Sequence, residues 1–368
     1  MFKISDLDTP ALMLREDILL ENIKDMSSFA KEVGVKLRPH IKAHKIPAIA
    51  NMQLEMGAKG ITVSKLGEAE VMIDAGIKDI LIAYQLIGKN KMEKLMNLAK
   101  KAKITVAVDS LEGIKYLNQA SQKYRQRIDV VIEINSGLDR CGVLPGLATL
   151  KLANHIKKLE NLILKGIMTH AGHVYGATER EEVDKIGRYE GEVMVETARL
   201  LRENGFNVST VSVGYKKKKK ISGLVEGVTE IRPGNYVFYD AIQIGLGVAV
   251  EEDCSLSVLS TVISRPTPER VVIDAGSKVF ALDQGAHGKS SVQGFGLVKG
   301  HSDVIIERLS EEHGILRVNP NSSLQIGDKI EIIPNHACTV INLFDEVNVI
   351  KREKVIKVWN IEGRGRVR

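Results

Sequence analysis

The segment from Arg38 to Lys45 reads RPHIKAHK and places Lys42 between two histidines and close to an arginine. Neighbouring cationic groups favour the neutral form of a lysine amine, and a neutral amine is a nucleophile that can form an imine with a carbonyl compound. The sequence therefore makes Lys42 a candidate for covalent catalysis. The alternative is a lysine exposed in a loop, which is the ordinary environment of this residue type.

A second candidate is the sequence His336-Ala337-Cys338. In an extended segment residues i and i+2 point to the same side, so we expect the imidazole and the thiol to meet at one point. Imidazole nitrogen and thiolate sulfur suit a divalent ion such as zinc, and two protein ligands leave coordination positions for water or a substrate. The alternative is a buried cysteine beside a surface histidine.

The elements that position these residues follow an alternating pattern. Short β-branched runs alternate with longer segments of helical period through the first two thirds of the chain, which is typical of a parallel α/β fold. In one helical segment, Lys89–Lys101, the residues Met92, Leu95, Met96 and Ala99 recur along one face. Eight βα units predict a TIM barrel. The eight predicted strands are Val35–Arg38, Gly60–Ser64, Asp79–Tyr84, Ile104–Asp109, Asp129–Asn135, Leu164–His170, Thr210–Gly214 and Thr229–Arg232.

Active sites of TIM barrels lie at the carboxyl ends of the strands. The segments that follow four of the predicted strands are rich in His, Lys, Arg and Tyr, a combination that predicts an anionic ligand and proton transfer. These four segments are Arg38–Lys45, Asn135–Gly142, His170–Tyr175 and Arg232–Tyr236.

From about residue 246 the pattern changes to short strands joined by turns rich in Gly, Asn and Asp. We expect a barrel over residues 10–245 and a second, all-β domain over residues 246–368, with residues 1–9 packed on the second domain. The strands expected there lie within residues 255–264, 269–276, 304–310, 313–318, 328–334, 346–351 and 355–363.

Charge and composition exclude several classes of protein. The 52 basic and 46 acidic residues give a net charge of +6, but without the run Lys216–Lys220 the net charge is +1, and aromatic residues make up only 4% of the chain. A nearly neutral body with few aromatics does not resemble a nucleic-acid-binding protein, so we expect no nucleic-acid partner.

The sequence also argues against a membrane protein. No apolar run approaches the ~20 residues that a membrane-spanning helix requires. The first ten residues form no apolar leader, and three cysteines are too few and too scattered for a disulfide framework. We expect a cytoplasmic protein without a membrane partner.

Longer motifs are distributed along the chain: RPHIKAHK, SKLGEAEVMIDAGIKDIL, EINSGLDRCGV, MTHAGHVYG, GVTEIRPGNYVFYD, DAGSKVFALD, LSEEHGIL and PNHACTVINLF. They resemble the D-threonine aldolase and D-serine dehydratase family of pyridoxal-phosphate enzymes. The resemblance extends from Asp8 to Phe344. It implies the fold of alanine racemase, a TIM barrel followed by a β-domain, and a homodimer.

The resemblance implies a role for individual residues at the cofactor site. Lys42 matches the lysine that forms the Schiff base with pyridoxal phosphate. Arg140 matches the arginine that hydrogen-bonds the phenolic oxygen of the cofactor, Tyr175 lines its ring, and Arg232 lies near the pyridine nitrogen. The other residues expected to bind the cofactor are His40, Gly214 and Tyr236, together with Gly234 and Asn235, whose backbone N–H groups would bind the phosphate.

The resemblance also implies a metal and a substrate. His336 and Cys338 match the family's ligands for a divalent ion, manganese or zinc, and the expected substrate is a small D-3-hydroxyamino acid. If His173 or a metal-bound water removes the hydroxyl proton, the Cα–Cβ bond cleaves to glycine and an aldehyde, the aldolase outcome. We expect this activity, that of a D-threonine aldolase.

Three alternatives remain open at this point. If Lys42 instead removes the α-proton while the metal assists loss of hydroxide, the products are a keto acid and ammonia, as in a D-serine dehydratase. An amino-acid racemase would leave the His-x-Cys pair unexplained. A non-catalytic protein that binds pyridoxal phosphate would resemble the barrel alone and lack the second domain.

One segment departs from the family pattern. Where the family usually reads Gly-Ser-Thr-Pro-Thr after the seventh strand, this chain reads Gly214-Tyr215 followed by five lysines. The hydroxyl groups that bind the cofactor phosphate are therefore absent, and lysines are flexible point charges that repel one another.

Overall fold

The fold is described from a computed structural model that defines residues 2–170, 172, 180–214, 221–285 and 292–368 of the 368-residue chain. The chain divides into two compact units. Unit 1 comprises residues up to 25, residues 43–48 and residues 235–364, and unit 2 comprises residues 26–42, 49–234 and 365–368. The chain therefore passes between the units several times.

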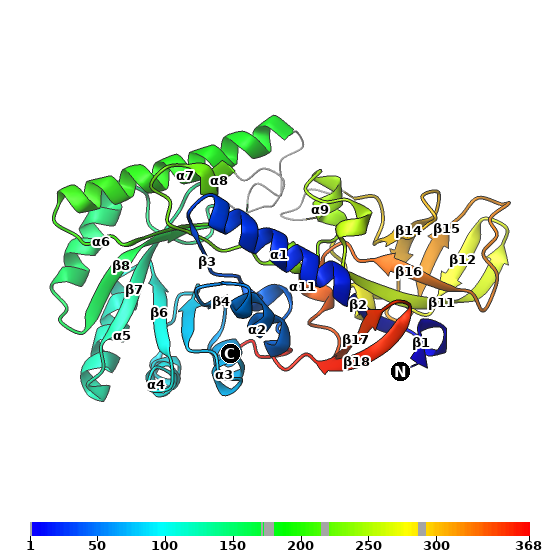
Figure 1. The fold of residues 1–368 in the computed structure, drawn as a ribbon, viewed down its shortest axis with the longest axis horizontal. Helices are drawn as coiled ribbons and strands as arrows, with labels where there is room; N and C mark the ends of the chain where they lie inside the picture. Colours follow the sequence, from blue (N-terminus) through cyan, green and yellow to red (C-terminus); the bar gives the residue numbers. More distant parts are fainter. Residues whose placement is uncertain (1, 171, 173–179, 215–220, 286–291) are drawn as a thin grey trace. The chain divides into compact units, whose positions relative to one another are not determined.

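Unit 2 contains an eight-stranded parallel sheet (Figure 1). A parallel bridge between His40 and Thr62 joins the two ends of the sheet, so the strands form a closed ring. All eight predicted strands are present, which confirms the TIM-like barrel. The order around the sheet is β3 (Lys36–Leu37), β10 (Glu230–Ile231), β9 (Thr210–Val213), β8 (Leu162–Thr169), β7 (Ile128–Ile134), β6 (Lys103–Val108), β5 (Asp79–Ile82) and β4 (Ile61–Val63).

Helices connect the successive barrel strands. The predicted helix at Lys89–Lys101 is confirmed, and Met92, Leu95 and Met96 are buried along one of its faces. The helices are α1 (Glu16–Glu32), which precedes β3, and α2 (Pro47–Glu55), α3 (Leu66–Asp74), α4 (Lys89–Leu98), α5 (Leu111–Tyr124), α6 (Leu147–Lys157), α7 (Arg180–Glu203) and α8 (Ile221–Leu224).

The barrel core contains an apolar cluster formed by neighbouring strands. Leu81, Ala107, Val131 and Met168 come from β5, β6, β7 and β8 and pack together. Side chains fill the body of the barrel, so we expect a ligand to bind at the carboxyl ends of the strands.

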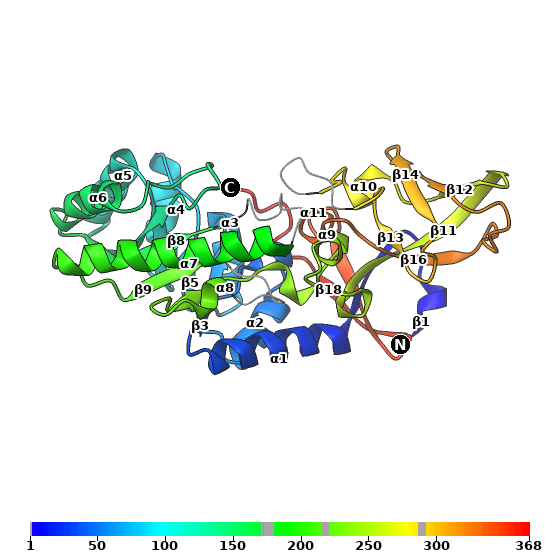
Figure 2. The same ribbon diagram turned by 90° about the horizontal axis from the view of Figure 1, so that it is seen from above.

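The described residues of unit 1 form a ten-stranded sheet. Most of its strands are yellow or orange in Figure 2. The seven strands predicted after residue 246 are all present. A pairing between the strands at 256–267 and 329–333 closes the last six strands of the order into a barrel. The order is β1 (Phe2–Lys3), β18 (Lys354–Asn360), β17 (Glu346–Lys351), β2 (Ala11–Arg15), β11 (Leu256–Thr267), β12 (Arg270–Ile273), β15 (Gly314–Arg317), β14 (Ile305–Leu309), β13 (Leu297–Val298) and β16 (Lys329–Ile333).

Strand β2 was not predicted from the sequence. It pairs antiparallel with β11 and parallel with β17, and its first four residues are buried. A strand buried on both faces has a continuous apolar run, which periodicity alone cannot distinguish from the start of a helix.

Three short helices complete unit 1: α9 (Ala241–Gly245), α10 (Ser277–Phe280) and α11 (Ala337–Val340). In the part of the chain that the structure describes, no helix is long and apolar enough to cross a membrane.

Candidate active site

His40 and Lys42 lie at the carboxyl end of β3, where two neighbouring strands hold the chain. The backbone N–H of His40 donates to the carbonyl oxygen of Pro233 at 2.8 Å, and that of Thr62 donates to Pro39 at 2.7 Å. Lys42 is half-buried in a 3₁₀ turn, Ile41–Ala43. The structure therefore places Lys42 at the rim where a TIM barrel binds its ligands.

The ring of His40 is oriented by two contacts. Its Nδ1 accepts from the backbone N–H of Lys42 at 3.3 Å, and its Nε2 lies 3.3 Å from the hydroxyl of Ser64. In a neutral imidazole one nitrogen accepts and the other donates, so Nε2 carries the hydrogen. His40 consequently ties the turn that carries Lys42 to the end of β4.

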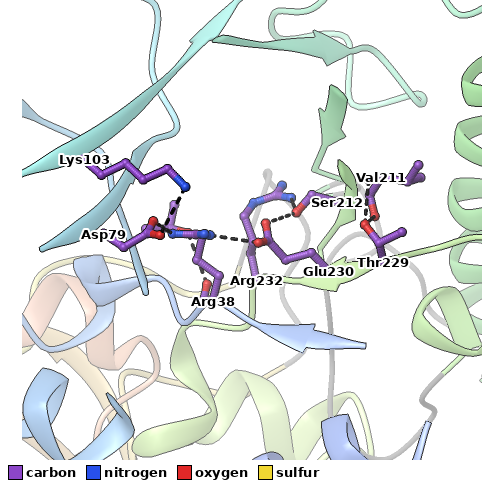
Figure 3. A network of polar contacts seen from close by, with 9 residues as sticks. Arg38, Asp79, Lys103, Val211, Ser212, Thr229, Glu230 and Arg232 are labelled. Carbon is purple, nitrogen blue, oxygen red and sulfur yellow. Dashed lines mark hydrogen bonds and ion pairs between the residues drawn. The ribbon is translucent and has the colours of Figure 1, made fainter. Parts of the chain in front are cut away.

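A network of charged and polar side chains crosses the barrel below this rim (Figure 3). Arg38 donates from Nε to Glu230 at 2.8 Å and from Nη1 to Asp79 at 2.6 Å. Burial alone would lower the pKa of Arg38, but Glu230 and Asp79 reverse this and raise it. The hydroxyl of Ser212 donates to the second oxygen of Glu230 at 2.7 Å. Both oxygens of this buried carboxylate are therefore paired.

Arg232 extends the network toward the carboxyl end of β8. Its guanidinium donates to the hydroxyl oxygen of Ser212 and to the carbonyl oxygen of Thr169, and the residue is 7% exposed. Burial lowers the pKa of Arg232, because no carboxylate hydrogen-bonds it among the described residues. These two contacts use two of the five N–H donors of an arginine. The others remain available to a ligand.

The loop after β7 carries Arg140 at the rim. An isolated bridge joins Ile134 to Val143 and closes the loop, and Gly142 within it adopts a φ of 104°. Arg140 is exposed, and Cys141 follows it in the chain. Cys141 in turn lies 3.4 Å from a carboxylate oxygen of the buried Glu133. Burial and Glu133 raise the pKa of the Cys141 thiol, so it stays protonated and donates.

The remaining cofactor candidates differ in their surroundings. The backbone N–H of Gly214 donates to the buried carboxylate of Glu190 at 3.0 Å. The backbone N–H groups of Gly234 and Asn235 donate to no acceptor among the described residues. Tyr236 is buried. His173, Tyr175 and the run Lys216–Lys220 lie outside the described residues.

The segment of His336 and Cys338 is not extended, so that prediction was wrong. His336 is the residue before the one-turn helix α11, and Cys338 is the second residue of that helix. The turn nevertheless brings the thiol of Cys338 near enough to the imidazole of His336 to raise the pKa of the imidazole. The expected convergence of imidazole and thiol is present, and it arises from a turn in place of a strand.

Two carboxylates surround this pair. Asp283 Oδ2 lies 3.6 Å from His336 Nδ1 and accepts from the hydroxyl of Thr339 at 2.7 Å. Asp240 Oδ2 accepts from the backbone N–H of Ala337 at 3.0 Å. Burial alone would lower the pKa of His336, but Cys338 and the two carboxylates raise it to about 11. The surroundings of the imidazole are thus strongly negative.

Family models match both parts of the chain. The model for the N-terminal domain of alanine racemase matches residues 15–241, and a model for a serine dehydratase domain matches residues 255–350. The first match covers more than half of the chain. The chain belongs to the alanine racemase-like family of pyridoxal-phosphate enzymes.

Several curated members of this family match over nearly the full chain. D-threonine aldolase of Arthrobacter sp is 33% identical over 98% of this chain and 94% of that protein. D-threo-3-hydroxyaspartate dehydratase of Delftia sp. (strain HT23) is 30% identical over 96% of this chain and 97% of that protein. D-serine dehydratase of Dictyostelium discoideum is 30% identical over 96% of each. The family relatives are lyases that use pyridoxal phosphate, and some are aldolases while others are dehydratases.

Solved structures of the family agree closely with this fold. D-threonine aldolase from Filomicrobium marinum has a TM-score of 0.92 at 33% identity, covering 100% of this chain and 98% of that chain. The dehydratase from Delftia sp. HT23 has a TM-score of 0.91 at 30% identity, covering 98% of this chain and 99% of that chain. One variant of that dehydratase, with a cysteine replaced by alanine, was solved in a metal-free form, and another replaces the histidine two residues earlier.

The barrel residues fit the family's cofactor in their chemistry. Pyridoxal phosphate combines an aldehyde, an aromatic nitrogen and a phosphate. Lys42 offers an amine at the rim, Arg232 offers a buried guanidinium with unused donors, and Gly234 and Asn235 offer unused backbone N–H groups. Unused N–H groups of consecutive residues are typical of an anion site.

The residues of unit 1 fit a divalent ion in part. His336 and Cys338 supply a nitrogen and a sulfur near each other within a negative environment, which suits zinc or another borderline ion. Within the described ranges, no group of three or more His, Cys, Asp and Glu residues could complete a metal site.

Sequence reasoning missed the residues that hold the predicted ones in place. Ser212, Glu230 and Asp79 support Arg38 and Arg232, and Asp240 and Asp283 support the His336–Cys338 pair. One signal was available: Arg38 and Glu230 are charged residues that lie in or beside predicted strands of the barrel. Such residues need a buried partner of opposite charge.

Proposed function

We propose that the chain is a lyase that depends on pyridoxal phosphate and a divalent metal and acts on D-3-hydroxyamino acids, with D-threonine aldolase as its activity. The observation that carries this proposal is the occurrence, in one chain, of Lys42 at the barrel rim and of an imidazole and a thiol near each other in the turn of His336 and Cys338. The amine accounts for the cofactor, and the imidazole–thiol pair accounts for a metal that a simple racemase does not need.

The barrel residues hold the cofactor and move a proton. When bound, pyridoxal phosphate withdraws electrons from Cα of an amino acid and weakens the bonds to that atom. Lys42 holds the cofactor aldehyde through its amine and returns a proton to Cα of the product. Arg232 and the backbone N–H groups of Gly234 and Asn235 hold the aromatic nitrogen and the phosphate, so that the ring is fixed relative to Lys42.

The residues of unit 1 act on the hydroxyl group. When bound, a divalent ion supplies a Lewis acid toward the β-hydroxyl of the substrate. His336 and Cys338 hold the ion, and Asp283 orients the imidazole of His336. His173 takes the hydroxyl proton; the Cα–Cβ bond then breaks, its electron pair stays with Cα, and the aldehyde leaves.

A D-serine or D-3-hydroxyaspartate dehydratase is the second candidate. The match of residues 255–350 to a serine dehydratase domain favours it, because that span contains His336 and Cys338. In this reaction Lys42 removes the α-proton, hydroxide leaves from Cβ, and hydrolysis of the resulting enamine gives a keto acid and ammonia.

Incubation with D-threonine and with D-serine, each with added pyridoxal phosphate and manganese or zinc, separates the candidates. Glycine with acetaldehyde supports the aldolase, and a keto acid with ammonia supports the dehydratase. A protein that binds the cofactor but converts neither substrate would support the non-catalytic alternative.

The Lys42→Ala variant tests the anchor. We expect it to lose turnover and the visible absorbance of the covalently bound cofactor, because alanine has no amine. Lys36→Ala is the matched control, since Lys36 lies exposed on β3, the strand that precedes the turn of Lys42, and should keep both properties. Turnover of Lys42→Ala at the rate of the control would contradict the proposal.

A further inference from the structure

One oxygen atom of Asp240 joins two segments that the proposed function treats separately. Asp240 Oδ2 accepts from the side-chain Nδ2 of Asn235 at 2.7 Å and from the backbone N–H of Ala337 at 3.0 Å. Its other oxygen accepts from the backbone N–H of Gln243 at 3.0 Å and caps α9. All four residues belong to unit 1.

The two segments carry different ligands. Asn235 is one of the two residues whose unused backbone N–H groups would bind the cofactor phosphate. Ala337 lies between His336 and Cys338, the proposed metal ligands. Asp240 therefore contacts the side chain of a phosphate-binding residue and the backbone of the metal-binding turn through one atom.

The carboxylate of Asp240 is buried and depends on its protein hydrogen-bond donors. Asp240 is 1% exposed, so water cannot replace a lost N–H donor. A buried carboxylate is stable only when N–H groups satisfy it, and here three do so. A shift of Asn235 therefore either moves Asp240 and the turn at Ala337 or leaves a donor unsatisfied.

We propose that Asp240 is a positioning residue that couples binding of the cofactor phosphate to binding of the metal. This inference rests on the proposed function. An anion on the backbone N–H of Asn235 restricts that residue and its side chain, which restricts Asp240 and hence the turn that carries His336 and Cys338. By linkage, the metal tightens cofactor binding by the same factor.

Attraction between the phosphate and the metal ion would produce coupling of the same sign. It would not depend on the side chain of Asn235, whereas coupling through Asp240 would. The Asn235→Ala variant distinguishes the two, because it removes the contact with Asp240 and keeps the backbone N–H for the phosphate.

The test is calorimetric titration of full-length, metal-free protein with zinc and with manganese, without and with saturating pyridoxal phosphate. In the wild type we expect the cofactor to tighten metal binding on the order of 10-fold. In Asn235→Ala we expect most of the tightening by the cofactor to be lost, measured as the ratio of the metal affinities of this variant with and without pyridoxal phosphate. In Asp240→Asn we expect weaker metal binding in both conditions and no tightening.

Asp283→Asn is the matched control. Asp283 also contacts the metal-binding turn, through His336 and Thr339, but has no contact with Asn235. We expect it to weaken metal binding and to retain the tightening by cofactor. Circular dichroism establishes whether each variant is folded. If Asp240→Asn does not fold, Asn235→Ala still tests the proposal.

The outcomes separate the two proposals. A wild type that binds no metal or no cofactor would overturn the proposed function and this inference together. A wild type that binds both with independent affinities would overturn only the inference. Full tightening in Asn235→Ala would also overturn it, since the coupling would then be electrostatic.

Discussion

At the scale of single residues, the hydroxyl group of Ser212 bridges two charged side chains of the barrel. Ser212 donates to Glu230 and accepts from Arg232, so one hydroxyl connects a buried anion to a buried cation without an ion pair between them. A direct ion pair would occupy the guanidinium with a carboxylate. With Ser212 between the two groups, Arg232 keeps donors for a ligand.

Removal of this hydroxyl should therefore lower the stability of the folded protein. We expect Ser212→Ala to lower the free energy of unfolding by about 1–3 kcal/mol, because it leaves an oxygen of Glu230 and a donor of Arg232 unsatisfied in the interior. Urea denaturation measures the change. Ser209→Ala is the control. The Ser209 hydroxyl donates to the carbonyl oxygen of Lys165 at 3.1 Å on the surface, so its loss should change the free energy of unfolding by less than about 0.5 kcal/mol. Equal changes in the free energy of unfolding for the two substitutions would contradict a contribution of the buried network to stability.

At the scale of elements, a charged group joins strands of the ten-stranded sheet. Glu331 on β16 accepts from Arg15 on β2 at 2.8 Å and from Lys299 at 3.1 Å. Burial alone would raise the pKa of Glu331, but Arg15 and Lys299 lower it below the ordinary value of 4.5. The folded state therefore favours the ionised carboxylate more strongly than the unfolded state does.

This difference predicts a pH dependence. Because the folded pKa of Glu331 is lower than the unfolded one, its contribution to stability is present above about pH 4.5 and is lost as the pH falls through the folded pKa. We expect Glu331→Gln to cost about 1–3 kcal/mol at pH 7 and progressively less below pH 4.5. Denaturant titrations of both proteins across this pH range measure the difference.

The matched control is Glu353→Gln. Glu353 also pairs with Arg15, at 2.7 Å, but its side chain is 70% exposed. Exposed ion pairs contribute little, so we expect a change below about 1 kcal/mol. A difference between wild type and Glu331→Gln that stays constant from pH 7 to pH 3 would contradict the assignment.

At the scale of the whole molecule, the residues proposed to bind the cofactor and the metal can be assigned to the two units of the chain. The chain passes from unit 2 to unit 1 directly after Lys42 and again directly after Gly234. Three of the residues proposed to bind the cofactor, Lys42, Gly234 and Asn235, thus lie next to points where the chain changes unit. The proposed metal ligands belong to unit 1 alone.

Removal of the metal tests this division of roles. We expect dialysis against a chelator to reduce turnover by at least about 100-fold, which corresponds to the several kcal/mol that a Lewis acid supplies. Manganese or zinc should restore it, and the ion that restores more activity at equal occupancy identifies the preferred metal. Lys42 should still bind the cofactor covalently in the chelated protein. Full turnover by protein shown by atomic absorption to contain no metal would refute a role for the ion.

The sequence by itself determined the elements and their order. Runs such as Asp129–Asn135 and Leu164–His170 form strands because β-branched residues suit a buried pleated surface, and each run predicts its strand without knowledge of its neighbours. The position of Lys42 at the barrel rim followed from the same reasoning, since the carboxyl ends of parallel strands meet at one edge. The resemblance of the motifs then predicted which of the rim residues would bind the cofactor.

Only the tertiary structure decided which side chains satisfy one another. Arg38, Asp79, Ser212 and Glu230 are far apart in the chain and meet because the barrel closes β3 against β10. The conformation of the His336 segment was likewise decided by packing, because Asp240 accepts the N–H of Ala337 and favours a turn over the predicted strand. A hydrogen bond depends on distances of a few tenths of an ångström between distant segments, and local residue patterns carry no information at that precision.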